Sequence, residues 1–413
     1  MAFVREYGWA SNVCPAVTLF MLAAMTRSRI NGAFLKSLMR KKLLTRFSPA
    51  IVFILMLAII TGCAGTTTPK GWSGVAISSG DLFVGSMDGR IIGLNATDRS
   101  RLWNDIPITT TTSGGAGCAP ATTGLAIYST PVVSNGLVYV AGYNGKIYAI
   151  TVDRGTIRWT YPPETNLQPL IGGITIVDNR LYFASSSGRV YALAADTGDP
   201  LWGTPFQSGS KIWATPLIVG DTLYIGSFDK KMYAVDSSNG QTKWSFETEG
   251  AIISTPALQD NTLYFGSFDR FFYAIDAVSG TLKWKTPGTA GSWFWADPVF
   301  ANGNIYAPNL DGKLYIFNAA DGSEVVPPID LESSVASSPV LVGNNLVVAN
   351  QNGKVWAIDV TQSSKRLLHD FQKTINSSLS VEGDIVYIHV PDEIDALNVS
   401  TGVIAWTLPL AAQ

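Results

Sequence analysis

The chain has 413 residues, of which 46% are hydrophobic, 11% are aromatic and only 15% are charged, with 39 glycines and a formal net charge of −2. This balance excludes an intrinsically disordered polypeptide and is typical of a β-rich globular protein. With two histidines and three cysteines, the sequence supports neither a disulfide framework nor a histidine-rich metal site.

The chain begins with a segment typical of an export signal. Basic residues between positions 39 and 46 precede an apolar run from Ala50 to Ile60. Because this run is too short to cross a hydrocarbon core of about 30 Å as a helix, it is interpreted as the core of a signal peptide. We expect residues 39–62 to be cleaved, and residues 1–38 to be an upstream start-site artefact or a dispensable extension.

The signal ends in the sequence Ile60-Thr61-Gly62-Cys63, which resembles the bacterial lipobox. The resemblance implies that Cys63 becomes the lipid-modified first residue and that residues 63–71 form a lipidated tether. The alternative is an ordinary secretory signal followed by an incidental cysteine. The expected location is the cell envelope, either the periplasmic face of an outer membrane or the outer face of a single membrane.

Cleavage would leave an acidic protein. Residues 1–62 contain eight of the 29 Lys/Arg and one of the 31 Asp/Glu, so 21 bases and 30 acids remain, a net charge of −9. This charge argues against nucleic acid or anionic lipid as the main partner. Cys118 then has no second cysteine with which to form a disulfide within the monomer.

A phrase ending in Gly-x-x-x-Trp recurs through the rest of the chain, most clearly at residues 236–244 and 276–284. Within each unit, four short runs rich in β-branched and aromatic residues are separated by turn sequences such as Asn135-Gly136 and Asp311-Gly312. A period of about 40–45 residues with four strands per unit is typical of a propeller blade. We therefore predict an all-β fold, an eight-bladed β-propeller of four-stranded antiparallel blades over residues 72–408, and no further domain.

The repeat resembles that of PQQ-like quinoprotein propellers, and a lipobox followed by such a propeller alone resembles the BamB-type lipoproteins of outer-membrane assembly. In this family the tryptophan of the outermost strand docks on the neighbouring blade. The resemblance therefore implies a blade-docking structural role for the six tryptophans at the ends of the repeats: Trp103, Trp159, Trp202, Trp244, Trp284 and Trp406.

The repeats depart from the consensus at several positions. Arg99 replaces the motif glycine in the first unit, and Asp395 occupies the usual tyrosine position in the eighth. The sixth and seventh units lack the docking tryptophan. These departures predict uneven packing between blades but leave the number of blades unchanged.

Large aromatic residues recur at one position in the repeat, just before the innermost strand. This position lies at the mouth of the central channel in a propeller, where loops on a rigid scaffold commonly bind partners. We interpret it as a shallow funnel for an extended peptide, or less favourably a sugar, although the rings could instead plug the channel. The candidate partner-binding residues are Trp72, Tyr128, Trp213, Trp293 and Trp295.

No residue pattern indicates catalysis. His369 and His389 are too few for a metal cluster, and no base accompanies Cys118 in sequence. We therefore predict no catalytic, cofactor-binding or metal-binding residues. A PQQ-dependent dehydrogenase is an alternative, but the chain lacks the adjacent cysteines and the length typical of those enzymes.

The sequence thus predicts a non-catalytic, lipid-anchored envelope scaffold, a monomeric propeller that binds protein partners through the loops of one face. The family resemblance implies a role in outer-membrane protein assembly. The alternative is a ligand- or carbohydrate-binding sensor on the outer face of a single membrane.

Overall fold

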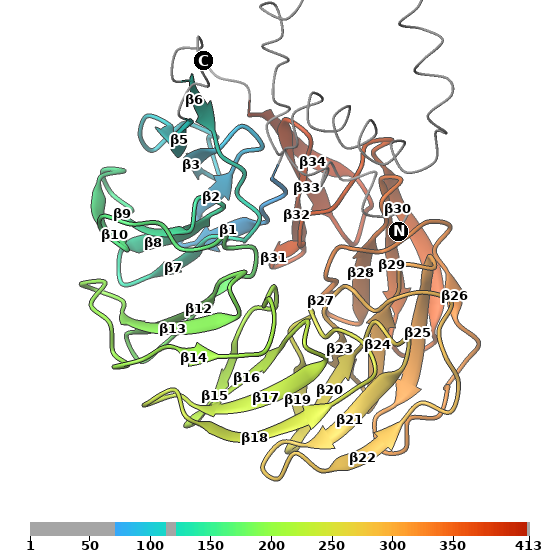
Figure 1. Ribbon diagram of the computed structural model, residues 1–413. Helices are drawn as coiled ribbons and strands as arrows, with labels where there is room; N and C mark the ends of the chain where they lie inside the picture. The colour runs from blue at the N-terminus through green and yellow to red at the C-terminus, as the bar shows by residue number, and fades with distance from the viewer. Residues whose placement is uncertain (1–70, 113–120, 411–413) are drawn as a thin grey trace, which may run out of the picture. The chain divides into compact units, whose positions relative to one another are not determined.

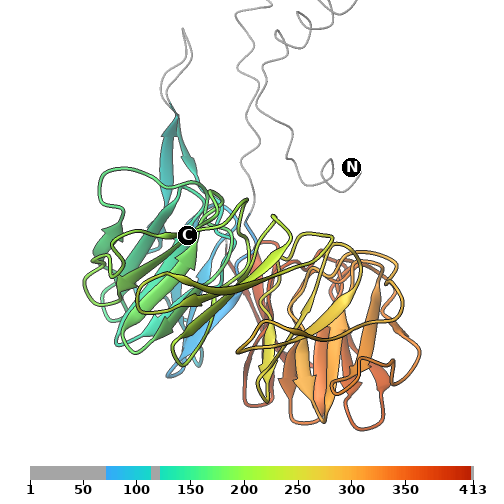
Figure 2. The same cartoon turned by 60° about the horizontal axis from the view of Figure 1, so that its bottom comes forward.

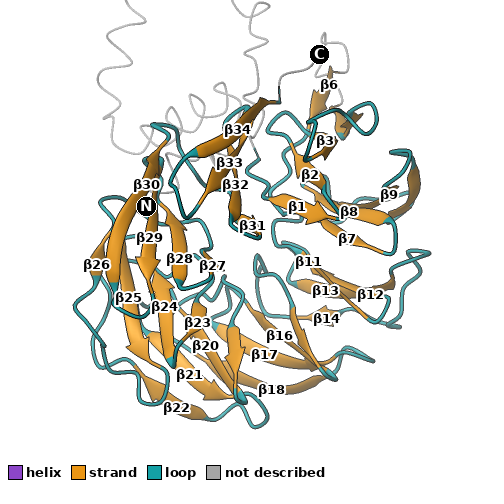
Figure 3. Ribbon diagram, turned by 180° about the vertical axis from the view of Figure 1, so that it is seen from behind, coloured by secondary structure: helices purple, strands orange, loops and turns teal. Residues whose placement is uncertain are grey.

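The computed structural model describes residues 71–112 and 121–410. The predicted signal peptide, Cys63 and the tether up to residue 70 lie outside the described residues, as does Cys118. Within the described ranges the chain forms eight four-stranded antiparallel sheets and one two-stranded sheet. Figures 1 and 3 show the sheets arranged as blades around a central axis, so the predicted all-β, eight-bladed propeller is confirmed.

Each of the first four blades is built from consecutive strands, innermost first. Blade 1 contains β1 (Val75–Ser78), β2 (Asp81–Gly85), β3 (Arg90–Asn95) and β4 (Ile106–Pro107). Blade 2 contains β7 (Val132–Ser134), β8 (Leu137–Gly142), β9 (Lys146–Thr151) and β10 (Ile157–Tyr161). Blade 3 contains β11 (Ile174–Val177), β12 (Arg180–Ala184), β13 (Arg189–Ala194) and β14 (Phe206–Gln207). Blade 4 contains β15 (Leu217–Val219), β16 (Thr222–Gly226), β17 (Lys231–Asp236) and β18 (Thr242–Glu247).

The other four blades repeat this order. Blade 5 contains β19 (Ala257–Gln259), β20 (Thr262–Gly266), β21 (Phe272–Asp276) and β22 (Leu282–Lys285). Blade 6 contains β23 (Val299–Ala301), β24 (Asn304–Pro308), β25 (Lys313–Asn318) and β26 (Ile329–Asp330). Blade 7 contains β27 (Val340–Val342), β28 (Asn345–Ala349), β29 (Lys354–Asp359) and β30 (Ser364–Asp370). Blade 8 contains β31 (Ser380–Glu382), β32 (Ile385–Val390), β33 (Glu393–Asn398) and β34 (Ile404–Pro409).

The hydrophobic core of the described residues lies between the blades. It consists of eight clusters of buried side chains, and each cluster draws its members from two neighbouring blades. The cluster that joins the last blade to the first includes Val75 and Leu82 from blade 1, and Tyr387 and Leu410 from the C-terminal end. A single four-stranded sheet would leave both of its faces exposed to solvent, so their burial requires neighbouring blades on both sides.

The repeated tryptophans connect successive blades. The indole Nε1–H of each donates to a backbone carbonyl of the next blade, at 2.9–3.1 Å. The donor and acceptor pairs are Trp103 with Val152, Trp159 with Ala195, Trp202 with Ser237, Trp244 with Ala277, and Trp284 with Ala319. Trp406 packs against the cluster between blades 8 and 1, with its ring centroid 5.8 Å from that of Tyr387. All six tryptophans thus lie at an interface between blades, and the docking role remains what the resemblance implies for them.

Two departures from the consensus, in blades 7 and 1, are compensated locally. Blade 7 has no docking tryptophan, but the Arg366 guanidinium donates to the carbonyl of Val399 in blade 8 at 3.0 Å. Blade 6 also lacks the tryptophan, and there the Tyr306 hydroxyl donates to the carbonyl of Val360 at 3.0 Å. The equivalent tyrosines of blades 2 to 5 make the same hydrogen bond beside their docking tryptophans, so this bond does not replace the missing one. Arg99 adopts a φ of +64°, so it reproduces the backbone conformation of the glycine that it replaces. Burial raises the pKa of Asp395, which accepts a hydrogen bond from Thr407.

One long connection adds structure to the propeller. Between blades 1 and 2 the chain forms the hairpin of β5 (Thr109–Thr112) and β6 (Ala121–Gly124), which projects from the blades in Figure 2. The residues between its strands, 113–120, are not described. The described part of the chain contains no helix with the length and hydropathy needed to cross a bilayer.

Candidate binding site at the mouth of the channel

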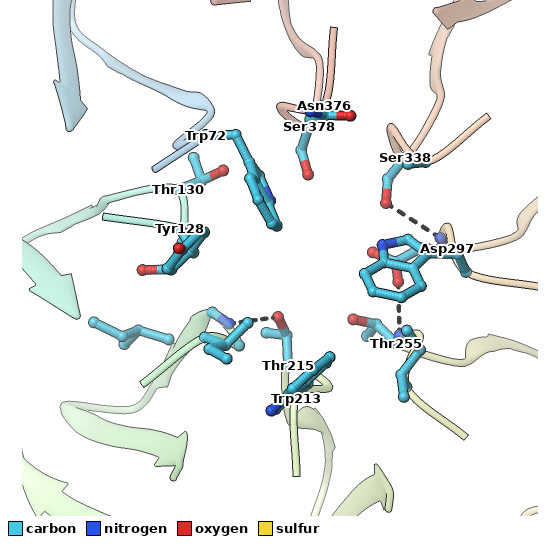
Figure 4. Close-up of a pocket in the computed structure, with 18 of the residues that line it drawn as sticks. Trp72, Tyr128, Thr130, Trp213, Thr215, Thr255, Asp297, Ser338, Asn376 and Ser378 are labelled. Carbon is cyan, nitrogen blue, oxygen red and sulfur yellow. Dashed lines mark hydrogen bonds between the residues drawn. The ribbon is translucent and has the colours of Figure 1, made fainter. Parts of the chain in front are cut away.

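The channel is lined by the segments that lead into the innermost strands. These segments enclose a cavity of about 440 Å³ to which all eight blades contribute side chains or backbone. Figure 4 shows Trp72, Tyr128 and Trp213 around this cavity, with smaller polar side chains between them. The position just before each inner strand is thus at the channel, as the repeat predicts. Its occupants are Trp72, Tyr128, Ile171, Trp213, Ile253, Trp295, Ala336 and Asn376.

A first group of rings lies over blades 1 and 2. Trp72 and Tyr128 meet edge to face with their ring centroids 4.4 Å apart, and Tyr143 is 5.3 Å from Tyr128. Edge-to-face pairs at this distance are attractive beyond their contact area. Burial raises the pKa of the Tyr128 and Tyr143 hydroxyls, so both remain neutral at physiological pH.

A second group of rings lies over blades 4, 5 and 6. We call it the aromatic ledge and define it as Trp213, Phe228, Phe268, Trp293 and Trp295. Phe268 is stacked on Trp293 with centroids 4.5 Å apart and planes 10° apart, and the Trp213 ring meets those of Phe228 and Trp295 at 4.6 and 6.3 Å. All five side chains are partly exposed. The ledge is therefore a pre-packed apolar surface that is partly exposed.

The structure brings the five candidate partner-binding residues into these two groups. Trp72 and Tyr128 belong to the first group, and Trp213, Trp293 and Trp295 belong to the ledge. The rings pack on one another and also border an open cavity, so they do not fill the channel completely.

Sequence reasoning missed the three rings that complete the groups, which are Tyr143, Phe228 and Phe268. They come from the turns between the second and third strands of blades 2, 4 and 5. A sequence signal for these rings exists, because each of them follows Gly or Gly-Ser at the same position of its repeat. Only the fold shows that the turn carrying the ring lies against the channel segment.

Two positions further along the channel segments, six of the eight carry a small polar residue and the other two carry glycine. Backbone N–H groups of one blade donate to side chains of the next, which connects the blades across the channel wall. Gly173 donates to Thr215 Oγ1 at 2.8 Å, and Thr255 donates to Asp297 Oδ1 at 2.6 Å (Figure 4). The Asp297 N–H donates in turn to Ser338 Oγ at 3.2 Å. Burial raises the pKa of the Asp297 carboxyl, against the effect of these hydrogen bonds.

The two histidines lie outside this arrangement. The His389 side chain is buried, with Nδ1 2.7 Å from the carbonyl oxygen of Ser73, which joins blade 8 to blade 1. His369 packs beside Phe371 with ring centroids 4.5 Å apart. Among the described residues no group of three or more His, Cys, Asp or Glu side chains could hold a metal ion.

Comparison with known proteins identifies related chains. The family model described as outer membrane protein assembly factor BamB matches residues 63–286 and 186–408. BamB of Yersinia pestis is 25% identical over 303 residues, which are 69% of this chain and 70% of that protein. BamB of Shewanella oneidensis is 23% identical over 308 residues, with the same coverage of 69% and 70%.

Solved structures show the same architecture. The crystal structure of BamB from Moraxella catarrhalis has a TM-score of 0.60 at 17% identity, covering 81% of this chain and 92% of that one. The computationally designed Ika8 protein has a TM-score of 0.64 at 16% identity, covering 78% of this chain and 94% of that one. At these identities the likeness concerns the fold alone.

Proposed function

Because this chain belongs to the family of the outer membrane protein assembly factor BamB, we propose that it is a non-catalytic scaffold of the cell envelope that binds protein partners during outer-membrane protein assembly. It is anchored by lipid at Cys63, and the partner docks on the channel face of the propeller. The closed ring suits this function, because a rigid surface loses little conformational entropy on binding.

The observation that carries the proposal is the aromatic ledge. Its rings come from three blades, stack at centroid distances of 4.5–6.3 Å, and remain partly exposed. Exposed clusters of Trp and Phe on a rigid scaffold are typical of protein interfaces, where such residues supply most of the binding energy. The ledge therefore supports a protein partner that places apolar side chains across blades 4–6.

The test uses the double variant Trp213→Ala/Trp295→Ala. Partners are cross-linked in membranes of the producing cell, purified with this protein and identified by mass spectrometry. We expect the double variant to lose most of its capture of outer-membrane assembly proteins, because truncating a central aromatic residue commonly costs about 2 kcal/mol or more of binding energy. A melting temperature within a few degrees of the wild type would show that the propeller remains intact.

Val278→Ala is the matched control, since this side chain is 70% exposed on an outer turn of blade 5 and takes no part in the ledge. Unchanged capture by the folded double variant would contradict the proposed docking face. Dye-linked dehydrogenase activity, or a quinone bound stoichiometrically to the purified protein, would contradict the non-catalytic function.

A further inference from the structure

The cavity below the aromatic groups has the dimensions of a ligand site. Its volume of about 440 Å³ lies within the range of roughly 300–1,000 Å³ that is typical of pockets for small ligands. Its walls are built from the inner segments of all eight blades. It is accessible from the mouth that carries the rings.

Among the described residues that line the cavity, the only charge is negative. Asp297 is the one charged side chain among the described residues that line it, and no lysine, arginine or histidine joins it there. The Asp297 side chain is half-buried in the channel wall, and no cationic side chain is among the described residues that line the cavity. Burial therefore disfavours its charged form and raises the pKa of its carboxyl. A cationic ligand would relieve this cost, whereas an anionic ligand would add to it.

The other lining groups suit the same ligand. The rings of Trp72, Trp213 and Trp295 border the cavity, and the faces of aromatic rings attract cations. Four residues with hydroxyl groups occupy the same repeat position as Asp297 and surround the same cavity (Figure 4): Thr130, Thr215, Ser338 and Ser378. Their oxygens can accept hydrogen bonds from an ammonium group.

From this juxtaposition we infer that the channel is a binding site for an organic ammonium group, which Asp297 pairs and the rings of Trp72, Trp213 and Trp295 surround. The group is either the side chain of a lysine in an extended peptide or the end of a free polyamine. This inference goes beyond the proposed function, because it concerns the channel itself and holds whether or not the ledge binds an assembly partner.

The experiment is a calorimetric titration of the purified protein at neutral pH with four probes. These are a short peptide with blocked ends and a single lysine, the same peptide with acetyl-lysine, the polyamine spermidine, and Ca²⁺. We expect at least one ammonium probe to bind, and the lysine peptide, if it binds, to bind at least tenfold more tightly than its acetylated counterpart. Binding of the peptide alone identifies a polypeptide source, and binding of spermidine alone identifies a free amine.

Asp297→Asn is the decisive variant. The amide oxygen can still accept from the Thr255 N–H, so the channel wall is retained while the charge is lost. We expect the variant to lose at least tenfold in affinity for the ammonium probe. Asp260→Asn is the matched control, because Asp260 is an exposed carboxylate in the turn between β19 and β20 of blade 5, outside the cavity lining.

Four results would overturn the inference. They are failure of both ammonium probes to bind, equal binding of the charged and acetylated peptides without binding of spermidine, binding of Ca²⁺ in preference to both ammonium probes, and full affinity in Asp297→Asn. The comparison of the two peptides on the wild-type protein decides the question even if this variant does not fold. Failure of the ammonium probes would leave partner capture by the ledge unaffected, so the two proposals fail separately.

Discussion

The indole ring of Trp202 in blade 3 lies directly against Gly240 of blade 4. A Cβ atom added to Gly240 would be 2.8 Å from Cε3 of Trp202, which is closer than real Cβ contacts allow. The same contact joins four further pairs, with nearest distances of 2.5–2.8 Å: Gly155 with Trp103, Gly198 with Trp159, Gly280 with Trp244, and Gly322 with Trp284. The glycine and the tryptophan of one Gly-x-x-x-Trp motif are therefore not partners of each other. Each glycine packs against the tryptophan of the preceding blade.

The first prediction concerns this contact. Gly240→Ala should destabilise the protein more than Gly303→Ala. Both glycines have a φ near +78°, with values of +79° and +77°, but only Gly240 faces a neighbouring ring. A left-handed alanine costs about 1–2 kcal/mol at either site, and overpacking against Trp202 should add about 1–3 kcal/mol at Gly240 alone. Urea unfolding of both variants measures the difference. Equal losses of unfolding free energy in the two variants would mean that the Trp202 ring can move aside at little energetic cost.

The second prediction separates the two roles of the docking tryptophan. Trp202→Phe removes the Nε1–H that donates to the carbonyl of Ser237, but Tyr182 still donates to the same oxygen at 3.0 Å. The lost hydrogen bond should therefore cost about 1 kcal/mol. Trp202→Ala also removes a ring that is only 6% exposed, and should cost about 3–5 kcal/mol. Thermal and urea unfolding test this order, and similar losses in both variants would assign the stability to the hydrogen bond instead.

The third prediction concerns pH and the seam between blades 8 and 1. Burial lowers the pKa of His389 below its usual value of 6.5, despite the contact with the Ser73 carbonyl. As pH falls through 6.5, the unfolded chain binds a proton at this histidine before the folded protein does, so the free energy of unfolding should fall. The loss should be complete once the pH is below the folded pKa.

The measurement is the unfolding free energy at pH 7.5 and pH 5.5. We expect the decrease between these values to be smaller in His389→Gln than in the wild type. His369→Gln, which changes the half-buried histidine beside Phe371, is the control and should retain the wild-type decrease. An identical decrease in His389→Gln would assign the acid sensitivity to other groups.

The fourth prediction tests the anchor. Cys63→Ala removes the thiol to which lipid would be attached, and the chain should then move from the membrane fraction to the soluble fraction after cell breakage. Mass spectrometry of the N-terminal peptide should show diacylglycerol on the wild-type protein at Cys63. A protein that stays in the membrane fraction without lipid would require another mode of attachment.

Most of the fold could be predicted from the sequence, because a propeller is a local structure repeated. The Asn135-Gly136 turn and the runs beside it specify a hairpin from neighbouring residues alone, and the regular spacing of such hairpins determines the number of blades. The residue that replaces a missing docking tryptophan could not be predicted in this way. Arg366 reaches Val399 across a blade interface, and no spacing along the chain indicates that contact.

The candidate site, too, could be predicted from the sequence only in part. The repeat placed Trp72, Trp213 and Trp295 at the channel, since equivalent positions in equivalent blades must lie at equivalent radii. It did not single out Asp297, although this residue stands where blades 4 and 5 carry threonine. A carboxylate at one of eight equivalent positions becomes informative only when the ring is closed, because the fold then shows that no cationic side chain is among the described residues lining the channel.

The sequence by itself determined the blades, their number and the inward-facing positions, because each of these depends on contacts within about 40 residues. The tertiary structure alone decided which rings form the ledge and which charge remains unbalanced in the channel. Those properties depend on side chains from blades far apart in the sequence, and closure of the ring brings them within reach of one another.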